Sequence, residues 1–313
     1  MPIMQALQSV LTIFLIIGLG FFLTKIKILN PDVGSIFSKI VIKVSLPCFM
    51  IYNLLTTFSL ESLISSSNML FIPFISMLIN FFLGFIISKF LNVDKNIRGT
   101  FYCMFSLSNT IFIGLPVSVS LFGNESIPYV LIYYIVNTLL FWSVGVYFIK
   151  KDGGHIEKTF SIKNVLKNLC TPPLIAFIVA IILISFKITP PKFVMDTCMY
   201  MGSLTTPLPL LFIGITLHEL SLKDLKLDLT GLTVLIGRFI ISPMVVALLM
   251  RNTYLPLLTQ EVFIIIAAMP VMTQVAIICK VYDADYKFAT SIGSLSTILS
   301  LIFIPIYMLL FSI

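Results

Sequence analysis

The sequence predicts an all-α membrane protein whose ten transmembrane helices form two inverted five-helix repeats, with helices 4 and 9 broken and crossing. Three observations lead to this fold class: an apolar composition, ten apolar segments of membrane-spanning length, and an internal repeat with matching helix breaks. Of the 313 residues, 58% are hydrophobic and 11% are charged, and the mean hydropathy is +1.09. A soluble domain carries about 25% charged residues, so this chain lacks the polar side chains that a soluble surface needs.

Each long apolar segment is interpreted as one span, because about 20 apolar residues cross a bilayer as a helix. The predicted spans are 4–23, 36–55, 69–90, 99–122, 128–149, 171–186, 194–217, 230–250, 260–281 and 288–311. The sixth is the shortest, and the segment 161–168 before it is predicted as an amphipathic lead-in helix.

Lysine and arginine collect in the cytoplasmic loops of membrane proteins. The loops after spans 1, 3, 5, 7 and 9 hold fourteen of these residues, and the loops on the other side hold only three, Lys187, Lys192 and Arg251. The fourteen are Lys25, Lys27, Lys89, Lys95, Arg98, Lys150, Lys151, Lys158, Lys163, Lys167, Lys223, Lys226, Lys280 and Lys287. This asymmetry predicts a multi-pass membrane protein with both termini extracytoplasmic and the 150–170 loop in the cytoplasm. It also accounts for the net charge of +7 without a nucleic-acid partner.

The second half of the chain repeats features of the first at an offset of about 159 residues. Pro47 falls near Pro207, the polar stretch 108–116 meets 267–275, and Asn137 meets Ser296. Two halves of five spans each must insert with opposite topology, and inverted repeats with matching broken helices are typical of secondary transporters. The predicted organisation is a first repeat over 1–150, a cytoplasmic linker over 151–170 and a second repeat over 171–313.

Two apolar segments are interrupted by polar residues at membrane depth. One reads SLSNTIFIGLPVSVSLFG from Ser106 to Gly123, and the other reads AMPVMTQV around Pro270. Proline removes a backbone donor and clashes with the preceding turn, and non-helical backbone inside a membrane needs protein or water to satisfy it. Pro116 and Pro270 suit the first turns of the second half-helices, whose free N–H groups favour an anion.

The candidate substrate site is built on these two breaks. Four side chains add hydrogen-bond donors of fixed reach there: Asn109, Thr110, Thr273 and Gln274. The alternative is a structural kink, since proline and glycine are frequent in membrane helices.

Arg238 lies within span 8, and a buried arginine in a membrane is a functional hypothesis by default. It would be the counter-charge of the substrate or a permanent cation in place of a coupling ion, and the alternative is snorkelling or bonding to backbone carbonyls. Asn137 and Ser296 would line the same cavity, or else join helices by hydrogen bonds. No span centre holds Asp or Glu, so coupling to protons or sodium is left open.

No cofactor or metal site is expected from the remaining residues. The five cysteines have no CxxC spacing, and the two histidines, His155 and His218, lie far apart without an HExxH motif. No catalytic Ser/His pair, paired aspartates or zinc ligand set occurs within the spans, which argues against an enzyme.

At the two broken stretches the sequence resembles the auxin efflux carrier family, in particular the bacterial branch labelled malonate or malate permeases. The family motif Asn-x-x-x-x-Gly-Leu-Pro is matched by Asn109, Gly114, Leu115 and Pro116, and Pro270 matches the proline that opens the break in span 9. The resemblance implies a fold like the sodium/bile-acid symporters, with a scaffold of spans 1, 2, 6 and 7 and a transport domain of spans 3–5 and 8–10. It also implies an elevator movement, a homodimer and a location in the bacterial cytoplasmic (inner) membrane.

These observations favour a secondary transporter that moves a small organic anion, a carboxylate or dicarboxylate, across the lipid bilayer. The alternative is a membrane sensor that binds a small molecule or lipid on the same fold without transport. A channel would differ from both in passing currents too large for a carrier.

Overall fold

The computed structural model describes residues 3–58, 67–155, 170–219 and 227–311. Most of the predicted linker, including the lead-in helix at 161–168, lies outside the described residues, as do Lys158, Lys163, Lys167, Lys223 and Lys226.

The described elements are α1 (Ile3–Lys25), α2 (Pro31–Ile40), η1 (Val41–Ser45), α3 (Leu46–Thr57), η2 (Ser67–Leu70), α5 (Phe71–Phe90), α6 (Arg98–Ser106), η3 (Thr110–Gly114), α7 (Leu115–Phe122), η4 (Asn124–Ser126), α8 (Ile127–Leu140), η5 (Phe141–Gly145), α9 (Val146–Asp152), α11 (Pro172–Ser185), α12 (Lys192–Ser203), α13 (Pro207–Glu219), α14 (Leu229–Ile236), η7 (Gly237–Ile241), α15 (Ser242–Met250), α16 (Leu257–Ala267), α17 (Gln274–Val281) and α18 (Tyr286–Phe311).

The described part of the chain is helical, and its one pair of residues in β-type contact is the isolated bridge between Ser108 and Val271. Six helical runs are long and apolar enough to span a membrane: Pro31–Thr57, Asn68–Phe90, Asn124–Asp152, Lys192–Glu219, Leu229–Met250 and Tyr286–Tyr307. Four shorter apolar segments accompany them: Leu11–Lys25, Thr110–Phe122, Pro172–Ser185 and Leu257–Ala267. The all-α membrane class is therefore confirmed, while the count of ten spans and the inverted repeat stay predictions.

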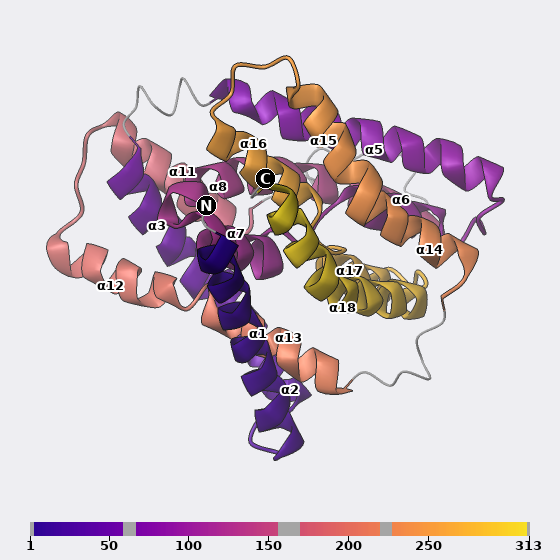
Figure 1. Ribbon diagram of the computed structural model, residues 1–313, viewed down its shortest axis with the longest axis horizontal. Coiled ribbons are helices and arrows are strands. Elements are labelled where there is room, and N and C mark those ends of the chain that lie inside the picture. Colours follow the sequence, from indigo (N-terminus) through magenta and orange to yellow (C-terminus); the bar gives the residue numbers. More distant parts are fainter. Residues whose placement is uncertain (1–2, 59–66, 156–169, 220–226, 312–313) are drawn as a thin grey trace.

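The helices pack as two groups. In one group α1 runs along α13, α2 also contacts α13, and α3 packs against both α11 and α12. In the other, α5 packs on α6 and α15, α16 packs on α15 and α8, and α17 packs on α18. Figure 1 shows the first group toward the left and bottom of the view and α5, α14, α15, α17 and α18 toward the right. Fewer contacts, such as those of α1 with α7, join the two groups.

Four of the described helical runs contain a π-turn, and three of these turns end two residues before a proline. The turns are η1 before Pro47, η3 before Pro116 and η7 before Pro243, and the fourth is η5. In η1 and η7 the residue after the turn donates to the carbonyl five residues back, Leu46 to Val41 and Ser242 to Gly237. A proline clashes with the carbonyl of the preceding turn, and widening that turn to a π-turn moves the carbonyl aside without ending the helix.

Two predicted spans differ in detail from the structure. Span 2 begins at Pro31 instead of residue 36, because the Asn30 side chain caps the Val33 N–H and Pro31 fills a first-turn position. Span 7, predicted as one helix over 194–217, lies within the helical run Lys192–Glu219 and contains a turn between α12 and α13, immediately before Pro207. Since the residue before a proline is disfavoured in the α region, the regular α-helix gives way to a turn there.

Asp152 joins the end of span 5 to the start of span 4. Its carboxylate accepts hydrogen bonds from the Gly99 N–H at 2.9 Å, the Thr100 N–H at 2.7 Å and the Thr100 hydroxyl at 2.9 Å. A carboxylate is favoured at a helix N-terminus, so Asp152 from α9 serves as the cap of α6. This contact fixes the helix that leads into the first break.

Replacing Asp152 by alanine is expected to lower the thermal unfolding midpoint of the purified protein by several degrees. The change removes hydrogen bonds to a partly buried charged group, each worth about 1.5–3 kcal/mol. Asp283→Ala is the matched control, because its partner His155 is exposed and such pairs contribute little. Equal midpoints for the two variants would contradict the capping role of Asp152.

Candidate functional site

The two breaks lie side by side. The Asn109 N–H donates to the Pro270 carbonyl oxygen at 2.8 Å, and Ser108 forms the antiparallel bridge with Val271. The Asn109 amide nitrogen also donates to the Thr273 hydroxyl at 2.9 Å. Extended backbone from one helix thus supplies partners for extended backbone from the other, which is how a break at membrane depth can be tolerated.

The second half-helices do not start at Pro116 and Pro270, the positions predicted from the sequence. Pro116 does lie at the beginning of α7, but the π-turn η3 precedes it, so the chain resumes its helical path at Thr110. The Asn109 side chain caps this start by accepting from the Phe112 N–H at 3.2 Å. In span 9, Pro270 lies in the extended segment, and α17 begins at Gln274. The prediction that Pro270 opens the second half-helix was therefore wrong.

Two side chains from neighbouring helices, Asn137 and Ser296, form hydrogen bonds with the backbone of the breaks. The Asn137 amide accepts from the Ser108 N–H at 3.1 Å and donates to the Ser108 carbonyl at 3.0 Å. The Ser296 hydroxyl accepts from the Val271 N–H at 3.1 Å. Ser108 and Val271 are the two bridged residues, so each break receives one polar side chain from the span that follows it in sequence. Both residues therefore join helices by hydrogen bonds, and Asn137 in addition lines a cavity.

Arg238 is fully buried and binds backbone carbonyls from both broken helices. Its Nη2 donates to the Ala267 carbonyl at 2.6 Å, its Nε and Nη2 to Met269 at 3.2 Å, and its Nη1 to Phe105 at 3.3 Å. Phe105 and Ala267 lie at the C-terminal ends of α6 and α16, where a positive charge is favoured. The guanidinium therefore joins two helix C-termini.

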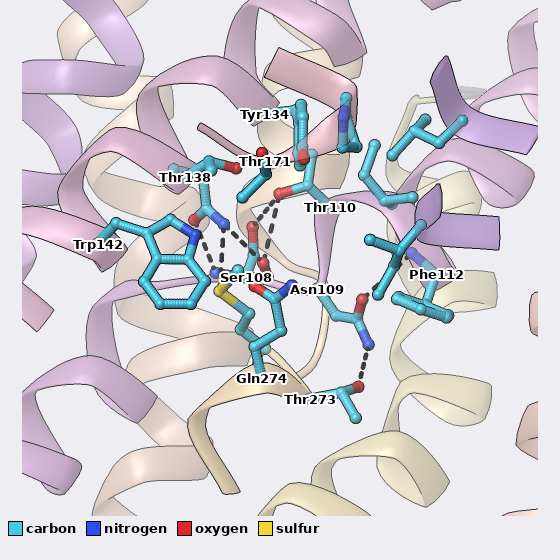
Figure 2. Close-up of a pocket in the computed structure, with 16 residues that line it drawn as sticks. Ser108, Asn109, Thr110, Phe112, Tyr134, Thr138, Trp142, Thr171, Thr273 and Gln274 are labelled. Carbon is cyan, nitrogen blue, oxygen red and sulfur yellow. Dashed lines mark hydrogen bonds between the residues drawn. The ribbon is translucent and has the colours of Figure 1, made fainter. Parts of the chain in front are cut away.

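A cavity adjoins the breaks on one side, and it is named here the Trp142 cavity. It measures about 530 Å³, including space open to the outside. Its polar lining residues are Ser108, Asn109, Thr110, Tyr134, Asn137, Thr138, Trp142, Thr171, Thr273 and Gln274, and its apolar ones are Ile42, Leu46, Ile111, Phe112, Pro173 and Met272. Figure 2 shows Thr138, Trp142 and Thr171 gathered to one side of Ser108, while the Asn109 side chain points away from them toward Thr273.

A second cavity, named the Thr216 cavity, lies between the breaks and spans 7 and 10. It measures about 630 Å³, again including open space, and it is lined by Asn109, Phe112, Ile113, Phe212, Ile213, Thr216, Val271, Met272, Thr273, Ala276, Ala289, Thr290, Gly293, Ser294 and Thr297. Asn109 and Thr273 line both cavities. The hydrogen bond between these two side chains therefore stands between the cavities.

The ten predicted site residues divide into two sets. Those that line a cavity are Asn109, Thr110, Asn137, Thr273 and Gln274. Those that shape the backbone or hold it without lining a cavity are Gly114, Pro116, Arg238, Pro270 and Ser296. Gly114 allows close approach of span 9, since a Cβ there would lie 2.6 Å from the Ile266 side chain.

Sequence reasoning missed Trp142, Tyr134 and Thr171 as lining residues. Trp142 is the single tryptophan of the chain, and it falls within a span rather than in the interfacial belts where tryptophan is enriched. That position was the signal that could have identified it.

The lining of both cavities mixes polar and apolar side chains and is uncharged. Neither contains Asp, Glu, Lys or Arg, and Arg238 is the one charged residue that is buried within the described ranges. Across those ranges no group of three or more His, Cys, Asp or Glu could hold a metal ion. The arrangement can bind a small polar molecule through neutral donors close to helix N-termini.

Broken membrane helices that meet beside cavities are typical of membrane transporters, and the comparison with known families agrees. Residues 5–308 match the family described as membrane transport protein. The chain therefore belongs to this family, that of the auxin efflux carriers, as its two motifs indicated.

Two archaeal relatives align over nearly the whole chain. One is named an uncharacterized transporter from Methanothermobacter thermautotrophicus, 25% identical over 311 residues, which are 98% of this chain and 99% of the relative. The other is named an uncharacterized transporter from Methanocaldococcus jannaschii, 25% identical over 310 residues, 97% of this chain and 98% of the relative. Family and relatives indicate a transporter rather than an enzyme, and the bacterial branch stays a prediction.

Arg238→Met is expected to lower the thermal unfolding midpoint strongly and to reduce the yield of folded protein. The substitution leaves the buried carbonyls of Ala267 and Met269 without this donor, and an unsatisfied buried group costs about 1–3 kcal/mol. Arg251→Met, at the exposed end of the same span, is the control. Similar midpoints and yields for both variants would show that the carbonyl contacts of Arg238 contribute little.

Asn137→Ala is expected to destabilise the protein more than Ser296→Ala. The first change removes two hydrogen bonds from the backbone of Ser108, whereas the second removes one from Val271. Thermal unfolding of both variants measures the difference, and a larger loss for Ser296→Ala would contradict this account of how the breaks are held.

Proposed function

We propose that the protein is a secondary transporter that carries a small organic anion, a carboxylate or dicarboxylate, through the membrane by alternating access. The observation that carries the proposal is the meeting of two broken helices beside a donor-rich, uncharged cavity. The first N–H groups of a helix have no intrahelical partner and carry partial positive charge. Two such starts, at Thr110 and Gln274, flank Asn109 and Thr273, and no acidic residue lines the cavities to oppose an anion.

The two groups of packed helices support an elevator-like movement. In the proposed division, spans 1, 2, 6 and 7 form a scaffold, and spans 3–5 and 8–10 form a transport domain that carries the breaks. The packing of α1 on α13 and of α3 on α11 and α12 fits the first unit, and that of α5, α6, α15 and α16 fits the second. The Trp142 cavity takes Ile42 and Thr171 from the first group and Trp142 and Gln274 from the second. A homodimer built on the scaffold completes the proposal.

The proposed location is the cytoplasmic membrane, with both termini outside. Both cavities take residues from span ends close to the basic loops: Thr171 follows the linker, and Thr290 lies three positions after Lys287. In this orientation these lining residues would lie toward the cytoplasmic side, which supports an inward-facing conformation in the proposed cycle.

Counterflow of labelled substrate in liposomes is the direct test. The purified protein would be assayed with C2–C6 mono- and dicarboxylates and indole-3-acetate, at two pH values, with and without sodium. Saturable counterflow of a carboxylate is the expected result, and its dependence on pH or sodium identifies the coupling ion. No counterflow by folded protein that a ligand still stabilises would instead favour a membrane sensor, and currents far above carrier rates would indicate a channel.

Asn109→Ala is expected to reduce counterflow at least tenfold, because it removes both the cap of η3 and the hydrogen bond to Thr273. Asn53→Ala is a matched control, since that amide bonds only to its own helix at Phe49. Normal rates in both Asn109→Ala and Arg238→Ala would overturn the site assignment.

A further inference from the structure

Polar atoms without partners cluster on one wall of the Trp142 cavity. Within the described residues, nine buried side-chain nitrogen or oxygen atoms make no hydrogen bond, and four of these line this cavity: Thr138 Oγ1, Trp142 Nε1, Thr171 Oγ1 and Gln274 Oε1. Buried polar groups are almost always hydrogen-bonded in folded proteins, so each exception calls for an explanation. Four exceptions around one cavity point to a ligand, because chance would distribute them over the molecule.

The hydrogen-bonding capacity of these four atoms indicates which polar group the ligand carries. An indole N–H is a donor only, while each threonine hydroxyl can donate or accept, and a glutamine amide offers two donors when it is turned round. Such a wall satisfies a group that accepts several hydrogen bonds at once. A carboxylate has two oxygens with about four acceptor positions, and hydrogen bonds to a charged acceptor are stronger than those to a neutral one.

The backbone places these donors for a shared ligand. Thr138 and Trp142 are four residues apart along span 5, which puts them on one helix face. The π-turn η5 begins at Phe141, and π-turns inside helices often occur at functional sites because they shift the direction of the side chains that follow. The turns η1 and η3 contribute Ile42 and Thr110 to the same cavity.

Thr171 approaches from the other group of helices. It immediately precedes α11, and its side chain makes no capping hydrogen bond there, although a threonine at that position normally caps its helix. In Figure 2 it lies close to Tyr134 and Thr138, on the same side of the cavity as Trp142. A ligand held by Thr171 and Trp142 together would therefore bridge the two groups.

We propose that Thr138 Oγ1, Trp142 Nε1 and Thr171 Oγ1 form the anion subsite that holds the carboxylate of the transported molecule. This inference rests on the proposed function for its substrate class and adds the residues that recognise the charge. The carboxylate oxygens accept from the indole N–H and the two hydroxyls, and the rest of the molecule lies against Ile42, Leu46 and Met272. Because the subsite needs span 6, it assembles only when the two helix groups are close, which links binding to the movement.

The single tryptophan makes the subsite directly observable. The purified full-length protein would be excited at the tryptophan band and titrated with acetate, propionate, butyrate and succinate at constant ionic strength. Chloride and the neutral amide of butyrate serve as ligand controls. The expected result is a saturable change of fluorescence with at least one carboxylate and none with the two controls. No saturable change with any carboxylate would overturn the proposal.

Conservative variants distinguish recognition from structure. Thr138→Val and Thr171→Val should each weaken carboxylate binding about tenfold, the effect of losing one hydrogen bond to a charged group. Since the Thr171 hydroxyl has no hydrogen-bond partner in the protein, the unfolding midpoint of Thr171→Val without ligand should stay equal or rise, as for an unsatisfied group replaced by an apolar one. A lowered midpoint with unchanged affinity would mean a structural role. Thr197→Val, on the exposed face of α12, is the matched control with unchanged binding.

Counterflow and binding separate this inference from the proposed function. Trp142→Phe keeps the ring but loses the donor, and carboxylate-dependent thermal stabilisation reports its affinity. If wild type shows counterflow and all three variants retain its half-saturation, the subsite is wrong while transport stands. If wild type shows no counterflow but binds a carboxylate that the variants bind weakly, the subsite stands and transport fails.

Discussion

The buried guanidinium of Arg238 is the contact on which the site depends. Two helices that stop in the middle of a membrane leave carbonyl groups without partners, and burying such groups in hydrocarbon costs several kcal/mol each. The C-terminal ends of α6 and α16 direct their carbonyls at one side chain, which donates to Phe105, Ala267 and Met269. The positive charge needs no carboxylate, because two helix C-termini provide the negative potential. Each half of the chain thus contributes the C-terminal carbonyls of one helix, and Arg238 from the second half binds both sets.

The prolines distort their helices about one turn before their own positions in the sequence. Pro47, Pro116 and Pro243 each follow a π-turn, and these turns place residues at or beside the site: η1 carries Ile42, η3 carries Thr110, and η7 carries Arg238. In η7 the glycine beside Arg238 permits close packing, since a Cβ at Gly237 would lie 2.3 Å from the Phe105 ring. A helix distortion that begins as relief of a proline clash therefore determines which way the neighbouring side chains point. This explains why prolines that resemble simple kinks in the sequence lie beside functional residues.

Hydropathy and polar residues in apolar segments were sufficient to locate most of the helices, both breaks and five of the ten polar residues that line the Trp142 cavity. The offset that paired Asn137 with Ser296 also led to two residues that hold the breaks. Other features had no local signature. Arg238 donates to backbone carbonyls 31 and 133 residues away in the sequence. Because every residue has a backbone carbonyl, the sequence does not indicate which ones the guanidinium binds. Trp142 was missed because an indole counts as apolar, although its one polar atom decides its role. The start at Thr110 was missed because proline marks the α-helix and not the π-turn before it.

The arrangement of helix ends determines the electrostatic potential at the site. The C-termini of the first half-helices are neutralised by Arg238, whereas the starts of the second half-helices keep N–H groups facing the breaks. Asn109 uses its side-chain oxygen to cap one of these groups and its nitrogen to donate to Thr273. Arg238 thus offsets the negative helix ends, and under the proposed function the remaining positive helix ends and neutral donors would favour an anion beside the Asn109–Thr273 contact. Since that contact borders both cavities, in the proposed transport cycle its geometry would have to change as an anion passes from one cavity to the other.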